Sequence, residues 1–164
     1  MIRRMKFSTI PLLCVLGCLS SAGCATRTET FDVSVRNDTA GPVIVWLTKI
    51  GGPEEEGWRS PESIAINFVV EDERVGGEVV PPGHKAETGK LKAKLDKESR
   101  AVLRIYKGEM TMSQLLANDK GSPSRVDLIL LPGRTSVAVV DQDGKLKIVP
   151  FDSSSSTTAP GPKP

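Results

Sequence analysis

The chain of 164 residues carries 22 lysines and arginines against 20 acidic residues, which gives a formal net charge of +2. This length suits one small domain. The first 23 residues contain three of the basic residues and none of the acidic ones, so the rest of the chain is close to neutral. A near-neutral domain argues against a nucleic-acid-binding surface, and we expect no nucleic-acid partner.

Residues 1–23 have the composition of an export signal. Arg3, Arg4 and Lys6 form a basic start, and an uncharged run rich in leucine, isoleucine and valine follows over residues 7–19. About a dozen such residues fit the core of a signal peptide but fall short of the roughly 20 that span a bilayer as a helix. Small residues occupy positions 20–23. The sequence therefore predicts a signal peptide that is cleaved during export.

The four residues Ser21-Ala22-Gly23-Cys24 resemble the lipobox of bacterial lipoproteins, although that family prefers leucine where this chain has Ser21. The resemblance implies cleavage between Gly23 and Cys24, diacylglycerol on the Cys24 sulfur, and often a further acyl group such as palmitate on the new amino group. Ala25 does not match the aspartate that retains such proteins in the inner membrane. The resemblance therefore favours lipid anchoring at the periplasmic face of the outer membrane. The alternative is an ordinary secretion signal that is cleaved near Ala22 and leaves no lipid.

The positions of the cysteines support the anchor independently. They lie at positions 14, 18 and 24, so a chain that begins at Cys24 has one thiol and no pair for a disulfide. An unpaired cysteine in an exported domain suggests that its sulfur is used. Without disulfides, the domain must be stabilised by its hydrophobic core.

Hydrophobic patterning divides the remaining chain into three parts. Residues 24–30 are polar and without periodicity, which predicts a lipidated tether, and residues 152–164 are rich in Ser, Thr and Pro, which predicts a disordered tail. Between them, segments typical of strands lie at 31–36, 43–50, 90–95, 101–106, 125–131, 135–140 and 145–149. Ser60 and Thr111 are typical starts of short helices that end near residues 67 and 118. The prediction for residues 31–151 is a mainly β domain, an antiparallel β-sandwich of about seven strands with one or two short helices.

A second, weak resemblance also concerns this domain. Residues 43–50 are apolar on both faces, which predicts a strand covered on two sides and antiparallel to residues 31–36. The turn Asn37-Asp38-Thr39, the segment Val43 to Leu47 and Pro81-Pro82-Gly83 are similar to the von Hippel–Lindau β-domain. That resemblance implies a sandwich and no particular function.

Three local features are candidates for a binding site. Lys90, Lys92 and Lys94 alternate with apolar residues, which is typical of an edge strand protected by lysines. The alternative for these lysines is contact with anionic lipid headgroups. The acidic loop 54–56 beside Trp58 is consistent with a cation or partner site, but a solvated loop whose tryptophan packs on the core is favoured. His84 is the only histidine and has no metal-ligand spacing around it.

The sequence contains no motif for catalysis. It lacks a cysteine beyond Cys24, a nucleophile elbow, a zinc motif and a phosphate-binding loop, so we expect no catalytic residues, metal or cofactor. The function predicted is a lipid-anchored cell-envelope protein, a non-catalytic domain that binds or scaffolds another envelope protein or a wall component. The alternatives are a membrane-anchored hydrolase, in which Glu71 and Asp72 are adjacent carboxylates, and a secreted sandwich without lipid.

Overall fold

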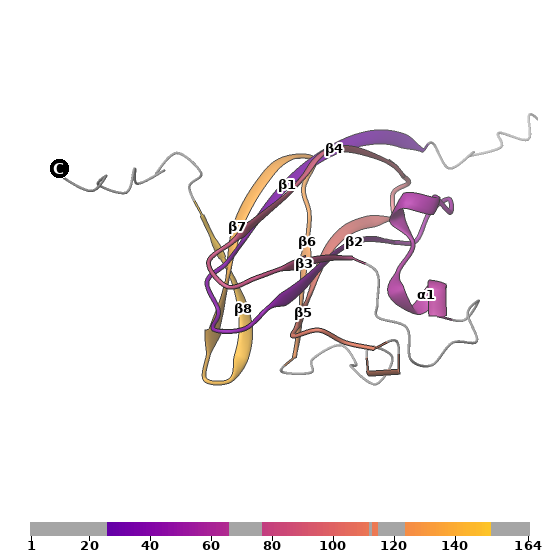
Figure 1. Ribbon diagram of the computed structural model, residues 1–164. Helices are drawn as coiled ribbons and strands as arrows, with labels where there is room; N and C mark the ends of the chain where they lie inside the picture. Colours follow the sequence, from indigo (N-terminus) through magenta and orange to yellow (C-terminus); the bar gives the residue numbers. More distant parts are fainter. Residues whose placement is uncertain (1–25, 66–76, 112, 115–123, 152–164) are drawn as a thin grey trace, which may run out of the picture.

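The computed structural model describes residues 26–65, 77–111, 113–114 and 124–151. These residues form two four-stranded sheets that pack face to face as a β-sandwich (Figure 1). The strands are β1 (Arg27–Asn37), β2 (Val43–Ile50), β3 (Glu78–Val80), β4 (Lys85–Leu95), β5 (Arg100–Lys107), β6 (Arg125–Ile129), β7 (Gly133–Gln142) and β8 (Lys145–Pro150). Two short helical segments, η1 (Glu56–Trp58) and α1 (Pro61–Ala65), lie between β2 and β3 along the chain. The predicted fold class is confirmed.

The first sheet has the strand order β4-β1-β7-β8. β1 pairs antiparallel with β4, and β7 pairs antiparallel with β8, but β1 and β7 are parallel. The tight turn between β7 and β8 has positive φ at both Asp143 and Gly144, which is the type I′ geometry of a two-residue hairpin. The predicted strands 135–140 and 145–149 therefore form a hairpin, whereas the parallel pairing of β1 with β7 departs from the predicted all-antiparallel arrangement.

The second sheet has the order β3-β2-β5-β6, and all its pairs are antiparallel. The prediction that residues 43–50 pair with residues 31–36 is wrong, because β1 and β2 lie in different sheets. The turn between them carries the chain from one sheet to the other. Asn37 fixes this turn: its side-chain amide donates to the carbonyls of Gly41 and Val80, both at 2.8 Å. Because this turn places β2 in the second sheet, β2 cannot form backbone hydrogen bonds with β1.

The core lies between the two sheets. Its largest fully buried members come from both, and include Phe31 and Val33 of β1 and Leu103 and Ile105 of β5. Trp58 joins this core from η1, with 5% of its surface exposed and its ring 5.6 Å from that of Phe31 in an edge-on contact. The interpretation of Trp58 as a residue packed on the core is therefore confirmed.

Several element boundaries differ from the predicted ones. β1 begins at Arg27, so residues 27–30, expected in the tether, pair with β4 instead. β4 begins at Lys85, five residues before the predicted start, and β6 ends at Ile129. α1 begins after Ser60, whose hydroxyl accepts the Ser63 backbone N–H at 3.1 Å, as expected for an N-cap. The predicted leader, the second half of the helix at 111–118, and the tail at 152–164 lie outside the described residues.

Candidate membrane-facing site

Cys24 and Gly23, the residues of the predicted lipidation and cleavage site, lie outside the described residues. The described chain begins at Thr26, and β1 begins at Arg27. Three residues of extended chain span at most about 11 Å. The start of β1 therefore lies within about 11 Å of Cys24, wherever that cysteine is held.

The three lysines of the predicted lipid-contact strip lie on β4, which is an edge strand of its sheet. Lys90, Lys92 and Lys94 are exposed, while Ala93 and Leu95 between and beside them are buried against the core. This alternation places the three amines on the outer face of the sheet. Both predicted features of the segment, an edge position and a lysine face, are confirmed.

The neighbours of the lysine strip on β1 are mostly uncharged. Thr28 lies opposite Lys94, Thr30 opposite Lys92, and Asp32 opposite Lys90. Within the described part of the chain, none of the three amines forms an ion pair. The strip thus presents positive charge to solvent, most strongly at the end where β1 begins.

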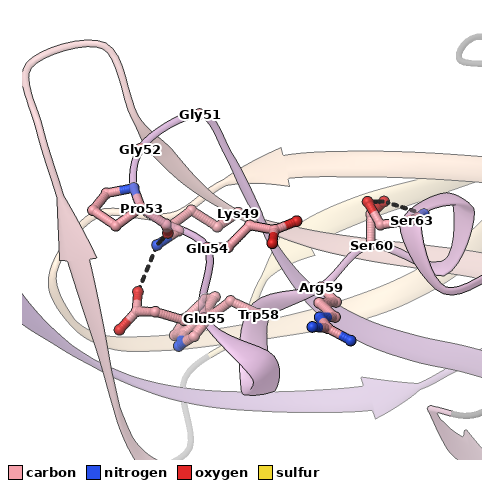
Figure 2. Close-up of a pocket in the computed structure, with 10 residues that line it drawn as sticks. All are labelled: Lys49, Gly51, Gly52, Pro53, Glu54, Glu55, Trp58, Arg59, Ser60 and Ser63. Atoms are coloured by element: carbon pink, nitrogen blue, oxygen red, sulfur yellow. Dashed lines mark hydrogen bonds and ion pairs between the residues drawn. The ribbon is translucent and has the colours of Figure 1, made fainter.

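The acidic loop lies beside the same edge, around a small hollow of about 130 Å³ (Figure 2). The Lys49 amine is buried there, with 3% of its side chain exposed, and it donates to the Pro53 and Lys94 carbonyls and to Glu55 at 2.5 Å. Glu55 also accepts the Lys94 backbone N–H of β4 at 2.9 Å. The loop is therefore joined to the edge strand through Glu55 and its ion pair with the buried Lys49 amine.

The electrostatics of the Glu55 carboxyl follow from these contacts. Burial acts to raise its pKa, but the hydrogen bonds from Lys49 and Lys94 and the charges of both lysines outweigh that effect and lower the pKa. Glu55 is thus ionised and already neutralised by Lys49. The alternative of a cation site on residues 54–56 keeps only Glu54 and Glu56, which are exposed.

A second group of charges, missed by the sequence analysis, lies on the outer face of the other sheet. Arg104 of β5 is only 6% exposed, and its guanidinium donates to both carboxylate oxygens of Glu62 in α1, at 2.6 and 2.7 Å. Arg125 binds Asp127 through two bonds of 2.8 and 2.9 Å and lies 3.4 Å from Glu62. We call these four residues the arginine cluster.

The arginine cluster joins α1 to β5 and β6. Burial acts to raise the pKa of Glu62, but its own backbone N–H, the charge of Arg104 and the Ser60 hydroxyl lower the net value. Burial also raises the pKa of the adjacent Tyr106 hydroxyl. Two arginines and two carboxylates balance each other, so the cluster stabilises the position of α1 and offers no excess charge to a ligand.

The remaining sequence candidates add little chemistry. His84 is exposed on the turn after Pro81-Pro82-Gly83, where its Nδ1 lies 2.9 Å from the Pro82 carbonyl oxygen. Glu71 and Asp72 lie outside the described residues. Among the residues that the structure describes, no group of three or more His, Cys, Asp or Glu is placed to hold a metal, and no helix is long and apolar enough to cross a membrane.

Comparison with known proteins gives no relative from which a role could be transferred. No protein-family model, no curated protein and no solved structure matches this chain. Its function must therefore be argued from its own residues.

Proposed function

We propose that this chain is a lipid-anchored protein of the bacterial cell envelope and acts as a non-catalytic binding or scaffolding domain. The observation that carries the proposal is the sequence Ser21-Ala22-Gly23-Cys24, which follows an export-type leader and ends three residues before β1 begins. Acylation of Cys24 uses the one cysteine that remains after cleavage. Two or three acyl chains on one residue hold a protein stably to a bilayer.

The distance from the anchor to the folded domain determines how close the domain lies to the membrane. With Cys24 in the membrane surface, only residues 24–26 separate the lipid from β1, so the domain is held against the bilayer rather than on a long tether. Position 25 is alanine and not the aspartate that retains such lipoproteins in the inner membrane, which favours the periplasmic face of the outer membrane.

A binding role is favoured because two partly buried carboxylates of the described domain are already paired. Glu55 binds Lys49, and Glu62 binds Arg104, so neither is available as a general acid or base. A rigid sandwich beside the bilayer, with exposed sheet edges, suits contact with another envelope protein or with a wall component.

The anchor is tested by the intact mass of the full-length protein, expressed in a bacterial host and extracted from its membranes. We expect a chain that begins at Cys24 and carries added acyl mass. Cys24→Ser should abolish the added mass and the cleavage, while the matched leader variant Cys18→Ser should retain both. A soluble, unacylated chain from the wild-type gene would overturn the anchor and leave an ordinary secreted domain.

The binding role is tested separately, by amine-reactive cross-linking in intact cells followed by purification of the acylated protein. We expect one discrete envelope component to be recovered with the wild-type chain and to be lost with Cys24→Ser. Recovery of the protein alone, at several cross-linker lengths, would contradict a scaffolding role while leaving the anchor intact.

A further inference from the structure

The end of the sandwich where β1 begins carries an unusual number of exposed apolar side chains. Ile50 is 52% exposed, Ile129 61% and Leu131 77%. Ile50 lies opposite Arg100 and Ile129 lies opposite Val102, so the two isoleucines flank β5 near its first residues. Leu131 follows two residues later. We call Ile50, Ile129 and Leu131 the apolar rim.

A cleft of about 630 Å³ opens between the two sheets at this same end. Its floor is apolar, because Leu95, Ala101 and Leu130 are buried there. Ile129 and Leu131 line the cleft on one side, and Arg27, the first residue of β1, lines it on the other. The cleft and the apolar rim therefore lie directly beside the point where the chain arrives from Cys24.

The charges around the cleft are mixed. Arg100 donates only to the backbone carbonyls of Lys97 and Ser99, and neither Arg100 nor Lys97 forms an ion pair with a described residue. The carboxylates nearby are Asp96, which is bonded within its turn by Ser99, and Glu98; Arg27 is paired with Glu29 at 2.9 Å. Two unpaired cations thus stand beside the apolar rim, and apolar contact rather than net charge is the main attraction this end offers.

We infer that this end of the sandwich docks on the phospholipid surface of the membrane, with the apolar rim at the boundary between headgroups and acyl chains. The inference rests on the proposed anchor at Cys24. A linker of at most about 11 Å brings this end to the bilayer, and exposed apolar side chains at an interface are removed from water there. Arg100 and Lys97 then lie at the level of the lipid phosphates.

Docking in this orientation also determines how far the other parts of the molecule lie from the bilayer. The hairpin between β7 and β8 lies at the far end of the sandwich (Figure 1), nine residues beyond Gly133 and hence about 30 Å from the bilayer. On β4, Lys94 lies nearest the membrane and Lys90 about 13 Å farther away, so the lysine strip stands upright instead of lying flat on the lipid.

The absence of cysteines after Cys24 allows a clean test. Full-length protein carrying Leu131→Cys or Lys145→Cys is labelled with a small fluorophore and placed in vesicles of phosphatidylethanolamine and phosphatidylglycerol that contain nitroxide-labelled lipid. Leu131 is at the docking end and Lys145 is at the hairpin. We expect quenching at position 131 to be at least threefold stronger than at position 145.

Two further variants separate docking from the effect of the label. Ile129→Asp combined with Ile50→Asp should reduce the quenching at position 131 at least twofold. Val79→Asp removes another exposed apolar residue, 44% exposed and paired with Ile44 near the opposite end of β2, and should leave the quenching unchanged. Circular dichroism checks that each variant remains folded, as expected for substitutions at exposed positions.

The outcomes distinguish docking from anchoring, because the intact mass of each preparation is measured first. Equal quenching at positions 131 and 145 in acylated protein overturns the docking and leaves the anchor standing. An unacylated chain overturns the anchor. A chain labelled at position 131, in which Cys14, Cys18 and Cys24 are replaced by serine, is then added to the same vesicles, where quenching supports docking by the apolar rim and its absence overturns it.

Discussion

At the scale of single residues, Asn37 holds three segments of the chain together. It is fully buried, its amide donates to carbonyls in the turn before β2 and at the end of β3, and its Oδ1 accepts the backbone N–H and the hydroxyl of Thr39. A side chain with both donors and an acceptor is needed here, which asparagine supplies and an apolar residue does not.

Replacing Asn37 with alanine should therefore lower the free energy of unfolding by roughly 2–4 kcal/mol, because the Gly41 and Val80 carbonyls lose a buried donor. Urea unfolding followed by circular dichroism measures the change. The neighbouring variant Asp38→Asn removes only an exposed ion pair with Arg36 and should change the free energy by less than about 1 kcal/mol. Equal effects of the two variants would contradict the role assigned to Asn37.

The Lys49–Glu55 pair makes stability depend on pH. The pKa of Glu55 in the folded protein lies below its ordinary value of 4.5, so the unfolded chain binds the proton more readily. The stabilisation is complete above about pH 4.5 and is lost as the pH falls through the folded pKa. Glu55→Gln should cost roughly 1–2 kcal/mol at pH 7 and less at pH 3.

Thermal unfolding of both proteins between pH 7 and pH 3 checks this prediction. Glu54→Gln is the matched control, because Glu54 is exposed and forms no ion pair with a described residue; its unfolding curve should follow that of the wild type. If Glu55→Gln lowers the stability by the same amount at both pH values, the lost stability is steric in origin and the ion pair contributes nothing.

At the scale of elements, the sequence predicts where chain segments are extended better than it predicts what they pair with. Residues 31–36 and 101–106 alternate or cluster apolar side chains, and both are strands. Residues 27–30 and 85–89 escaped prediction because they are mostly polar and only Ala86 is deeply buried. They are strands because of their pairing: residues 27–30 of β1 pair with residues 92–95 of β4, and residues 85–87 of β4 pair with residues 34–36 of β1.

For the charged sites too, the sequence predicts local patterns but not the partners that lie far away along the chain. The lysine strip could be predicted, since its alternation is local in the sequence. The arginine cluster could not, because Arg104 depends on Glu62, which lies 42 residues earlier along the chain, and on Asp127 in the next strand. The one available signal is a lone arginine inside the apolar run at 101–106.

The arginine cluster should determine how firmly α1 is held. Glu62→Ala leaves the buried Arg104 without its best partner, so we expect α1 to separate from β5 more often. Hydrogen exchange in residues 60–65 should rise at least tenfold, while exchange in β1 stays unchanged. Glu56→Ala in η1 replaces an exposed carboxylate nearby and should leave both regions as in the wild type.

The lysines of β4 protect an edge strand, and this role can be separated from contact with lipid. Replacing Lys90, Lys92 and Lys94 together with valine should cause aggregation in light scattering, because a flat apolar edge offers unpaired backbone groups to another copy. Replacing all three with glutamate keeps the edge charged and should keep the protein monodisperse. Aggregation of the glutamate variant would show that positive charge, rather than charge of either sign, is required.

At the scale of the whole molecule, the short linker and the apolar rim could each hold the sandwich end-on at the membrane. A short linker enforces a high local concentration of this end at the lipid, whereas the apolar rim supplies affinity of its own. The two contributions respond differently to linker length. Ten Gly/Ser residues inserted between Ala25 and Thr26 would add an r.m.s. length of about 18 Å.

If the apolar rim binds lipid, lipid quenching of a fluorophore at position 131 should fall by less than twofold in the long-linker chain. Ile129→Asp in that same chain should then reduce it to the level seen at position 145, because neither the linker nor the rim still holds the end at the surface. If the long linker alone reduces the quenching to that level, the linker is what places this end at the membrane. The apolar rim would then be free to contact a protein partner, and a search for that partner should begin with Ile129 and Leu131.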